Sequence, residues 1–509
     1  MQSFGARLKN LCKRNSNSIM LVLVMAVANA ILVALKIQTS GYPFLSKHSL
    51  LIYAILFFIT TLIIFLLYKA KKNSWKIEII FLICGITLGI SYSLFIPIGG
   101  APDEPAHFWR AYELSEGKIF AQTDSEGNTG IYLPDNLQEL TTNKYSVSKN
   151  SYQPTINNFS EYISDNYILD STPGDSYAPF NYLPQIVGIW IGRILHLPFV
   201  PIFYLSRLFN MIMCITVIYF CIKYIPIMKK LIFLVGLFPM TMQLFSSVSA
   251  DGSIICAGMA LITFVLYAQK TMKRRINIKD ILLLTLICLT LVVSKPVYAF
   301  LCPILFWIPK ERFKSIKHKY AIIILLGLFV LALVLLRLFV ASSGEAKYDS
   351  SAQISFILAN PIIFTGILFK NVFLSPYFFT NSAIGQSLEW FSVGLCDPYI
   401  LTFLLFFAFL CAEREAKITR SLKAFVFCSF FIIIISTFTL MFIQWTEPGL
   451  STIDGVQGRY FLPIILLIPL FCLPTKKPKK KQIVKSNYLY IFATLANVYA
   501  IMMIFCTHI

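Results

Sequence analysis

Residues 77–97 read IEIIFLICGITLGISYSLFIP, and the polar motif 98–110, IGGAPDEPAHFWR, follows directly. A helix needs about 20 consecutive apolar residues to cross a hydrocarbon core of roughly 30 Å. We therefore predict a membrane span over 77–97, with an acidic motif beginning where the span leaves the membrane. The two glycines and two prolines of the motif predict an irregular turn, after which 106–116 is expected to form a helix that ends at Gly117.

Apolar runs of this kind recur along the whole chain, from 18–37 and 49–68 to the last residues. The chain has 509 residues, of which 57% are hydrophobic and 13% are charged, whereas about a quarter of the residues of a soluble domain are charged. The composition therefore excludes a soluble protein. We predict an all-α polytopic membrane protein with about 13 transmembrane helices, counted from apolar runs of spanning length.

The distribution of charged residues predicts how these apolar runs are oriented across the membrane. The net charge is +20, and the basic residues lie in short clusters between apolar runs, as expected for the cytoplasmic side of a membrane protein. This placement argues against a nucleic-acid partner. Residues 98–175 hold 12 of the 24 acidic residues and only four of the 44 basic ones. We therefore predict a multi-pass protein of the cytoplasmic membrane, with a cytoplasmic N-terminus and an extracytoplasmic loop over 98–200.

Three parts are expected along the chain. They are an N-terminal two-helix transmembrane extension, a transmembrane core, and a basic cytoplasmic loop with the last transmembrane helix, covering 1–76, 77–473 and 474–509. Within the core, 98–200 forms the long outer loop and 342–396 forms a second outer loop. Two short spans, near 297–309 and 459–473, complete the count.

Each outer loop contains an interrupted apolar segment. In the first loop, 182–197 contains Pro184 and Gly188, and we expect it to lie along the membrane surface as an amphipathic helix. If it were a true span, the next basic cluster would lie outside and all later spans would be inverted. In the second loop, Asn360-Pro361 interrupts 354–376, which favours an interfacial or re-entrant helix.

Ionisable groups at the outer ends of spans are candidates for function, because such groups are costly in a membrane. The motif after 77–97 supplies Asp103, Glu104, His107 and Arg110. Asp103, His107 and Arg110 are four and three residues apart, so they share a helix face. A carboxylate beside a histidine and an arginine suits a reaction that deprotonates an acceptor and expels an anion. A helix cap by Asp103, with Glu104 favouring the helix dipole, is the competing interpretation.

Later outer turns carry further candidates. Asp251 follows SSVSA and is either a second acid or a helix cap. Gln457, Arg459 and Tyr460 begin a span, where the arginine either grips a phosphate or anchors the helix at the interface. The remaining candidates are single basic residues near outer span ends, Arg207 and Lys295.

These motifs carry a resemblance. The succession of PDEPAHF at 102–108, NYLPQ at 181–185, SADG at 249–252, SKP at 294–296 and GRYFLP at 458–463 resembles the bacterial multi-pass membrane family known as domain of unknown function 2142 (DUF2142). The likeness extends from about the 77–97 span to residue 473. That family in turn is similar to the GT-C glycosyltransferases. This chain departs from their pattern by two additional N-terminal spans and has no recognisable soluble C-terminal domain.

The resemblance implies a GT-C-like bundle that transfers a sugar from a polyprenyl-phosphate carrier to an envelope glycan or lipid acceptor on the outer face. It implies that Asp103 is the general base, with Glu104 and Asp251 completing the catalytic set. The expected substrate-binding residues are His107, Arg110, Arg207, Lys295, Gln457, Arg459 and Tyr460. Asp103, Glu104 and His107 are candidate ligands for a divalent metal cation. A transporter or flippase, or a polymerase or ligase, of lipid-linked saccharides is the alternative, and a non-catalytic scaffold is a third.

Overall fold

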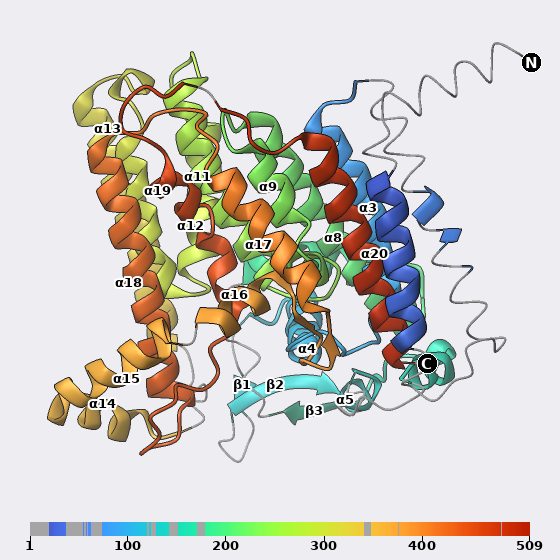
Figure 1. The fold of residues 1–509 in the computed structure, drawn as a ribbon. Coiled ribbons are helices and arrows are strands. Elements are labelled where there is room, and N and C mark those ends of the chain that lie inside the picture. Colours follow the sequence, from blue (N-terminus) through green and yellow to red (C-terminus); the bar gives the residue numbers. More distant parts are fainter. Residues whose placement is uncertain are drawn as a thin grey trace, which may run out of the picture.

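The computed structural model shows a helical bundle with smaller elements at one end (Figure 1). The residues that the structure describes are 20–36, 54, 57–58, 60–62, 74–119, 122–123, 129–141, 151–170, 179–340, 348–374, 376–479 and 481–508. The predicted span over 49–68 falls mostly outside them.

Long apolar helices form the bundle. Among the described residues, six helices are long and apolar enough to cross a membrane, or seven if one bent pair is counted as a span. The six are α3 (Ile77–Phe95), α8 (Phe199–Tyr224), α11 (Asp251–Lys270), α13 (Ile316–Val340), α18 (Arg420–Trp445) and α20 (Ser486–His508). Of the described residues, 72% are helical, so the prediction of a helical polytopic membrane protein is confirmed. The count of 13 and the GT-C-like arrangement stay predictions.

Shorter or irregular segments lie between these helices. Proline accounts for several of them, since Pro239 begins a new helix and Pro303 and Pro463 lie within 3-10 segments. The segments are Met20–Lys36, α9 (Lys229–Gly236), α10 (Pro239–Phe245), α12 (Ile278–Val292), η3 (Pro296–Trp307), η4 (Lys310–Arg312), α17 (Asp397–Cys411), η5 (Gly458–Ile464) and α19 (Leu467–Cys472). The predicted short spans near 297–309 and 459–473 correspond to η3 and to η5 with α19.

The basic turns meet at one end of the bundle. Lys230 Nζ pairs with Glu413 Oε1 at 2.9 Å. Two backbone hydrogen bonds join further turns, from the Ile276 amide to the Arg312 carbonyl at 2.8 Å and from the Ile418 amide to the Pro474 carbonyl at 3.1 Å. This is the upper end in Figure 1, whereas α4 (Glu104–Ser115) lies at the lower end.

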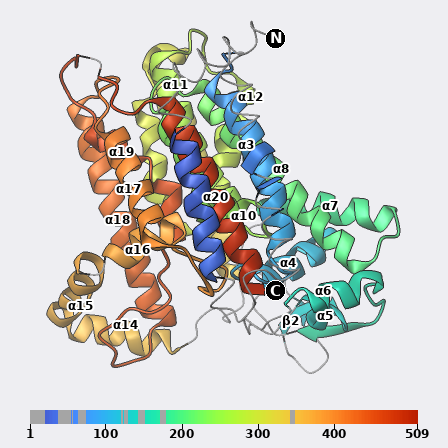
Figure 2. The same ribbon diagram turned by 45° about the vertical axis from the view of Figure 1, so that its right-hand side comes forward.

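The first loop forms a small cap at the lower end. Strands β1 (Gln122–Thr123), β2 (Thr129–Pro134) and β3 (Tyr167–Asp170) form an antiparallel sheet in that order. The helical pieces of the cap are α5 (Leu137–Thr141), α6 (Gln153–Asn157), η1 (Asn158–Ser160), η2 (Pro179–Tyr182) and α7 (Leu183–Ile194). Helix α7 projects sideways from the bundle (Figure 2). It forms where the sequence predicts an amphipathic helix, and Leu183, Trp190 and Ile194 on it are exposed.

The second loop folds into helices at the same end. Helix α14 (Ser350–Ala359) and helix α15 (Pro361–Phe373) meet at a bend of 108°, at the Asn360-Pro361 interruption noted in the sequence. Helix α16 (Pro376–Ile384) follows, and then the hairpin of β4 (Ser387–Leu388) and β5 (Val393–Gly394). The Gly458 amide donates to Ser382 Oγ at 3.1 Å, which fixes the start of η5 against α16.

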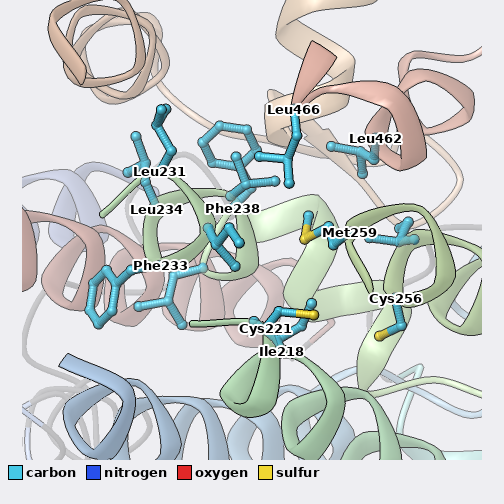
Figure 3. Packing of buried hydrophobic residues seen from close by; sticks show 14 of the residues in the cluster. Ile218, Cys221, Leu231, Phe233, Leu234, Phe238, Cys256, Met259, Leu462 and Leu466 are labelled. Carbon is cyan, nitrogen blue, oxygen red and sulfur yellow. The ribbon is translucent and has the colours of Figure 1, made fainter. Parts of the chain in front are cut away.

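The core joins η5 to the centre of the bundle. Figure 3 shows three residues of this core: Phe238 directly before α10, Met259 in α11 and Leu462 in η5. A Cβ added at Gly258 would lie 2.1 Å from the Pro463 carbonyl oxygen, so η5 rests directly on the backbone of α11. This close approach brings the beginning of η5 beside the beginning of α11.

Candidate functional site

Asp103 occupies an unusual backbone position directly before α4. Its φ is 60° and its ψ is 10°, in the left-handed region that non-glycine residues rarely adopt outside turns and functional sites. Its side chain makes no capping hydrogen bond to the described residues of α4, so the cap interpretation fails for this residue. Instead, Asp103 Oδ2 accepts a hydrogen bond of 2.6 Å from Arg459 Nη2.

Arg459 links Asp103 to a second acid. Its Nε lies 3.2 Å from Asp251 Oδ2, and Asp251 Oδ1 accepts from Lys295 Nζ at 2.9 Å. Four side chains from separate parts of the chain therefore alternate in charge. We call Asp103, Arg459, Asp251 and Lys295 the ion cluster. The structure brings these four predicted site residues together.

Aromatic rings border the ion cluster. Lys295 Nζ lies 4.1 Å from the centroid of the Tyr460 ring, close enough for a cation–π contact. The Tyr460 carbonyl accepts from the Tyr298 hydroxyl at 2.6 Å, which fixes η5 to η3. Gln457 is half-buried directly before η5, and its carbonyl accepts the Tyr460 amide. Two further candidates, Tyr460 and Gln457, thus lie on the segment that carries Arg459.

His107 faces the same region. Its Nδ1 lies 2.7 Å from the Tyr182 hydroxyl. Burial lowers the pKa of His107 below its ordinary value of 6.5, while the nearby carboxylates of Asp103 and Asp251 oppose that shift. The imidazole is therefore neutral near pH 7 and forms a hydrogen bond with Tyr182. The sequence offered Tyr182 only as one aromatic of a motif.

Glu104 turns away from the ion cluster toward Arg207. The pair is fully buried, with Arg207 Nε and Nη2 donating to Glu104 Oε1 and Oε2 at 2.8 and 2.6 Å. The remaining Arg207 donors bind the carbonyls at the end of α3, those of Ser93, Ile96 and Pro97. Glu104 Oε1 also accepts the Val248 amide at 2.9 Å. The pair thus ties α3, α4, α8 and the turn before α11 together.

Arg110 lies in a separate pair. Its Nη1 donates to Glu113 Oε2 at 2.6 Å, and its Nη2 donates to the Ile119 carbonyl at 2.7 Å. Helical spacing predicted that Arg110 shares a face with Asp103 and His107. In the structure, its guanidinium instead donates to Glu113 within α4 and to the Ile119 carbonyl after it. Its contacts in the structure are therefore within the cap and not with the ion cluster.

A buried polar network holds the chain neighbours of Asp251 and Lys295. Gln185 Nε2 donates to Asn210 Oδ1 at 3.0 Å and to the Ser249 carbonyl at 3.2 Å. Asn181 Nδ2 donates to Ser294 Oγ, and Ser253 Oγ donates to the Asn181 carbonyl at 3.1 Å. Amide side chains within apolar runs, such as Asn210 in α8, are the sequence feature that could have indicated this network.

Comparison with known proteins gives a family. The family described as "Predicted membrane protein (DUF2142)" matches residues 84–468. The chain belongs to this family. The match covers most of the chain and includes all four members of the ion cluster, so the resemblance inferred from the motifs is confirmed. No curated protein and no solved structure matches the chain.

The predicted metal ligands of this DUF2142 protein do not gather into a metal centre. Both Glu104 oxygens are held by Arg207, one of them also by the Val248 amide, and Asp103 Oδ2 is held by Arg459. Among the described residues, no three His, Cys, Asp or Glu side chains are placed to share an ion. We therefore derive no chemical step through a metal.

The ion cluster combines two abilities. Asp103 is 45% exposed, so its carboxylate can accept a proton from a group that approaches from solvent. Arg459 and Lys295 provide planar and point-like cationic donors beside it, which suit phosphate oxygens. Asp251 contacts both cations and fixes them relative to each other.

Proposed function

We propose that this DUF2142 protein is a GT-C-like membrane glycosyltransferase. It moves a sugar from a polyprenyl-phosphate donor to an envelope glycan or lipid acceptor at the outer face of the cytoplasmic membrane. The observation that carries the proposal is the ion cluster, in which an accessible carboxylate touches a cation suited to phosphate. Membership in a membrane protein family and the helical bundle agree with a lipid-linked substrate.

The chemistry follows from the donor. A polyprenyl phosphate leaves without a proton donor, so the reaction needs one base and cations rather than the paired acid and base of a glycosidase. Asp103 takes the proton of the acceptor hydroxyl while that oxygen bonds to the anomeric carbon. The bond from the anomeric carbon to the phosphate oxygen breaks, and its electron pair stays on the phosphate. Arg459 and Lys295 stabilise the charge that develops there, and the configuration at the anomeric carbon inverts.

The charge distribution supports an outer site. The basic turns gather at the opposite end of the bundle from Asp103, as at Lys230 and Arg312. Positive charge favours the cytoplasmic side, which supports an ion cluster at the outer face. Helix α7, which exposes apolar side chains beside α4, would then lie at the outer interface.

The test uses Asp103→Asn in the full-length protein. Asparagine tolerates the left-handed backbone as well as aspartate does, so the variant is expected to fold. Asp454→Asn is the matched control, because Asp454 is exposed on the segment before η5 and the change removes the same charge. A host strain without the gene receives each version, and its envelope glycans are compared.

We expect Asp103→Asn to give the glycans of the deletion strain and Asp454→Asn to restore those of the parent. Membranes supplied with a panel of labelled polyprenyl-phosphate sugars should transfer label only with the parent protein and the control. A transporter would move lipid-linked sugar without breaking the bond to phosphate, so release of polyprenyl phosphate separates the two classes. Full transfer by Asp103→Asn would remove the base from the mechanism.

A further inference from the structure

The cations of the ion cluster are already paired within the protein. Arg459 contacts both carboxylates, and Lys295 contacts Asp251. Two carboxylates and two cations make the cluster neutral overall. A phosphate that arrives must therefore compete with a carboxylate for the same donors.

The two carboxylates are held unequally. Asp251 is 8% exposed and contacts Arg459 and Lys295, whereas Asp103 is 45% exposed and, within the described part of the chain, forms an ion pair with Arg459 only. A half-exposed pair with one charged contact is weaker than a buried carboxylate between two cations. Asp103 is thus the carboxylate that an arriving phosphate displaces more easily.

The same contact engages the proposed base. Asp103 Oδ2 accepts from Arg459 Nη2 at 2.6 Å, which directs one of its two carboxylate oxygens toward the arginine. A phosphate that accepts from Nη2 would displace Oδ2 and leave it facing the exposed side of the site.

We infer that Asp103 and the donor phosphate exchange places on Arg459, so that donor binding releases Asp103 from the arginine. This inference rests on the proposed function and adds a step of donor binding to it.

The exchange is tested by equilibrium binding to the purified full-length protein in detergent. The probe is farnesyl phosphate, a short prenyl monophosphate. Farnesol provides the uncharged control, and inorganic phosphate distinguishes the headgroup from the chain. The proteins are the parent, Asp103→Asn and Asp454→Asn.

We expect Asp103→Asn to bind farnesyl phosphate about twofold to fivefold more tightly than the parent, the range that a partly exposed ion pair supports. Farnesol affinity should be equal in all three proteins, and Asp454→Asn should match the parent. The affinity for inorganic phosphate should also rise in Asp103→Asn, because the phosphate headgroup competes with Asp103 for Arg459. In an Arg459→Gln background, the effect of Asp103→Asn should vanish, since the two residues act through one contact.

Unchanged or weaker farnesyl phosphate binding by Asp103→Asn would overturn the exchange. If that variant also fails to transfer sugar, the base assignment survives and only the exchange on Arg459 is lost. If it transfers sugar normally, the base assignment fails, whereas a parent protein that transfers no label would remove the proposed function itself. A melting temperature equal to that of the parent ensures that binding is compared between folded proteins.

Discussion

Glu104→Gln should strongly destabilise the protein, although the side chain differs from glutamate by one group. In the structure, all five Arg207 N–H groups are used, two on Glu104 and three on carbonyls of the 93–97 segment. A glutamine offers one acceptor oxygen and turns an N–H₂ toward another donor. The guanidinium then keeps its charge in a fully buried site without its counter-ion.

Removing one partner of a buried ion pair costs about 3–5 kcal/mol. That is a large fraction of the stability of a typical protein, about 5–15 kcal/mol. Thermal unfolding in mild detergent, followed by tryptophan fluorescence, should show a melting temperature lower by about 3–5 °C. The matched control is Glu116→Gln, because Glu116 pairs with Arg193 and Lys118, whose side chains are 30% and 28% exposed.

Partly exposed pairs of this kind contribute about 1 kcal/mol or less, so the control should melt close to the parent. If Glu104→Gln and Glu116→Gln melt at the same temperature, the Glu104–Arg207 pair is no stronger than a surface pair. The argument that it holds α3, α4 and α8 in place would then be wrong.

Two other predictions concern the site and its support. Burial lowers the pKa of His107 below 6.5. Below about pH 6.5 the unfolded chain therefore binds a proton at this histidine that the folded protein does not bind. The free energy of unfolding is unaffected by His107 above that pH and should fall between about pH 6.5 and 5.5. Unfolding of the parent and of His107→Asn at both pH values measures this, and an equal loss in the two proteins would exclude His107 as the cause. Gly458→Ala should lower both stability and sugar transfer, because its Cβ would lie 2.2 Å from the Phe379 carbonyl oxygen and would displace the segment carrying Arg459. Gly366→Ala, where no described atom beyond its chain neighbours and its own helix backbone lies within 4 Å of the new Cβ, should behave as the parent does. Equal activity of the two variants would contradict the close-packing argument.

Apolar runs predicted the long helices, since spanning length and lack of charge are properties of one contiguous segment. The break at Asn360-Pro361 was equally local. The 3-10 character of η3 and η5 was less accessible, because Pro303 and Pro463 are compatible with a kinked helix as well as with a 3-10 segment.

For the site, the sequence indicated which residues carry charge near outer ends, but not how they pair. Asp103 and Arg459 are 356 positions apart, and Glu104 and Arg207 are 103 apart. Adjacent residues Asp103 and Glu104 face different partners because the left-handed turn at Asp103 redirects the chain. Helical spacing assigned Arg110 to the same face as Asp103, yet a nearby glutamate, Glu113, takes its guanidinium.

The depth of α20 in the bundle has a consequence for how the chain is made. In its most apolar stretch, 89% of the residues of this helix are buried. Asn497 on it accepts from the Tyr92 hydroxyl at 2.9 Å and donates to the Leu237 carbonyl at 2.8 Å. Tyr92 leaves the ribosome 405 residues before Asn497 does. The early helices must therefore wait in the bilayer without their Asn497 partner until α20 is inserted, which makes the nascent protein dependent on the insertion machinery or on temporary partners over that interval.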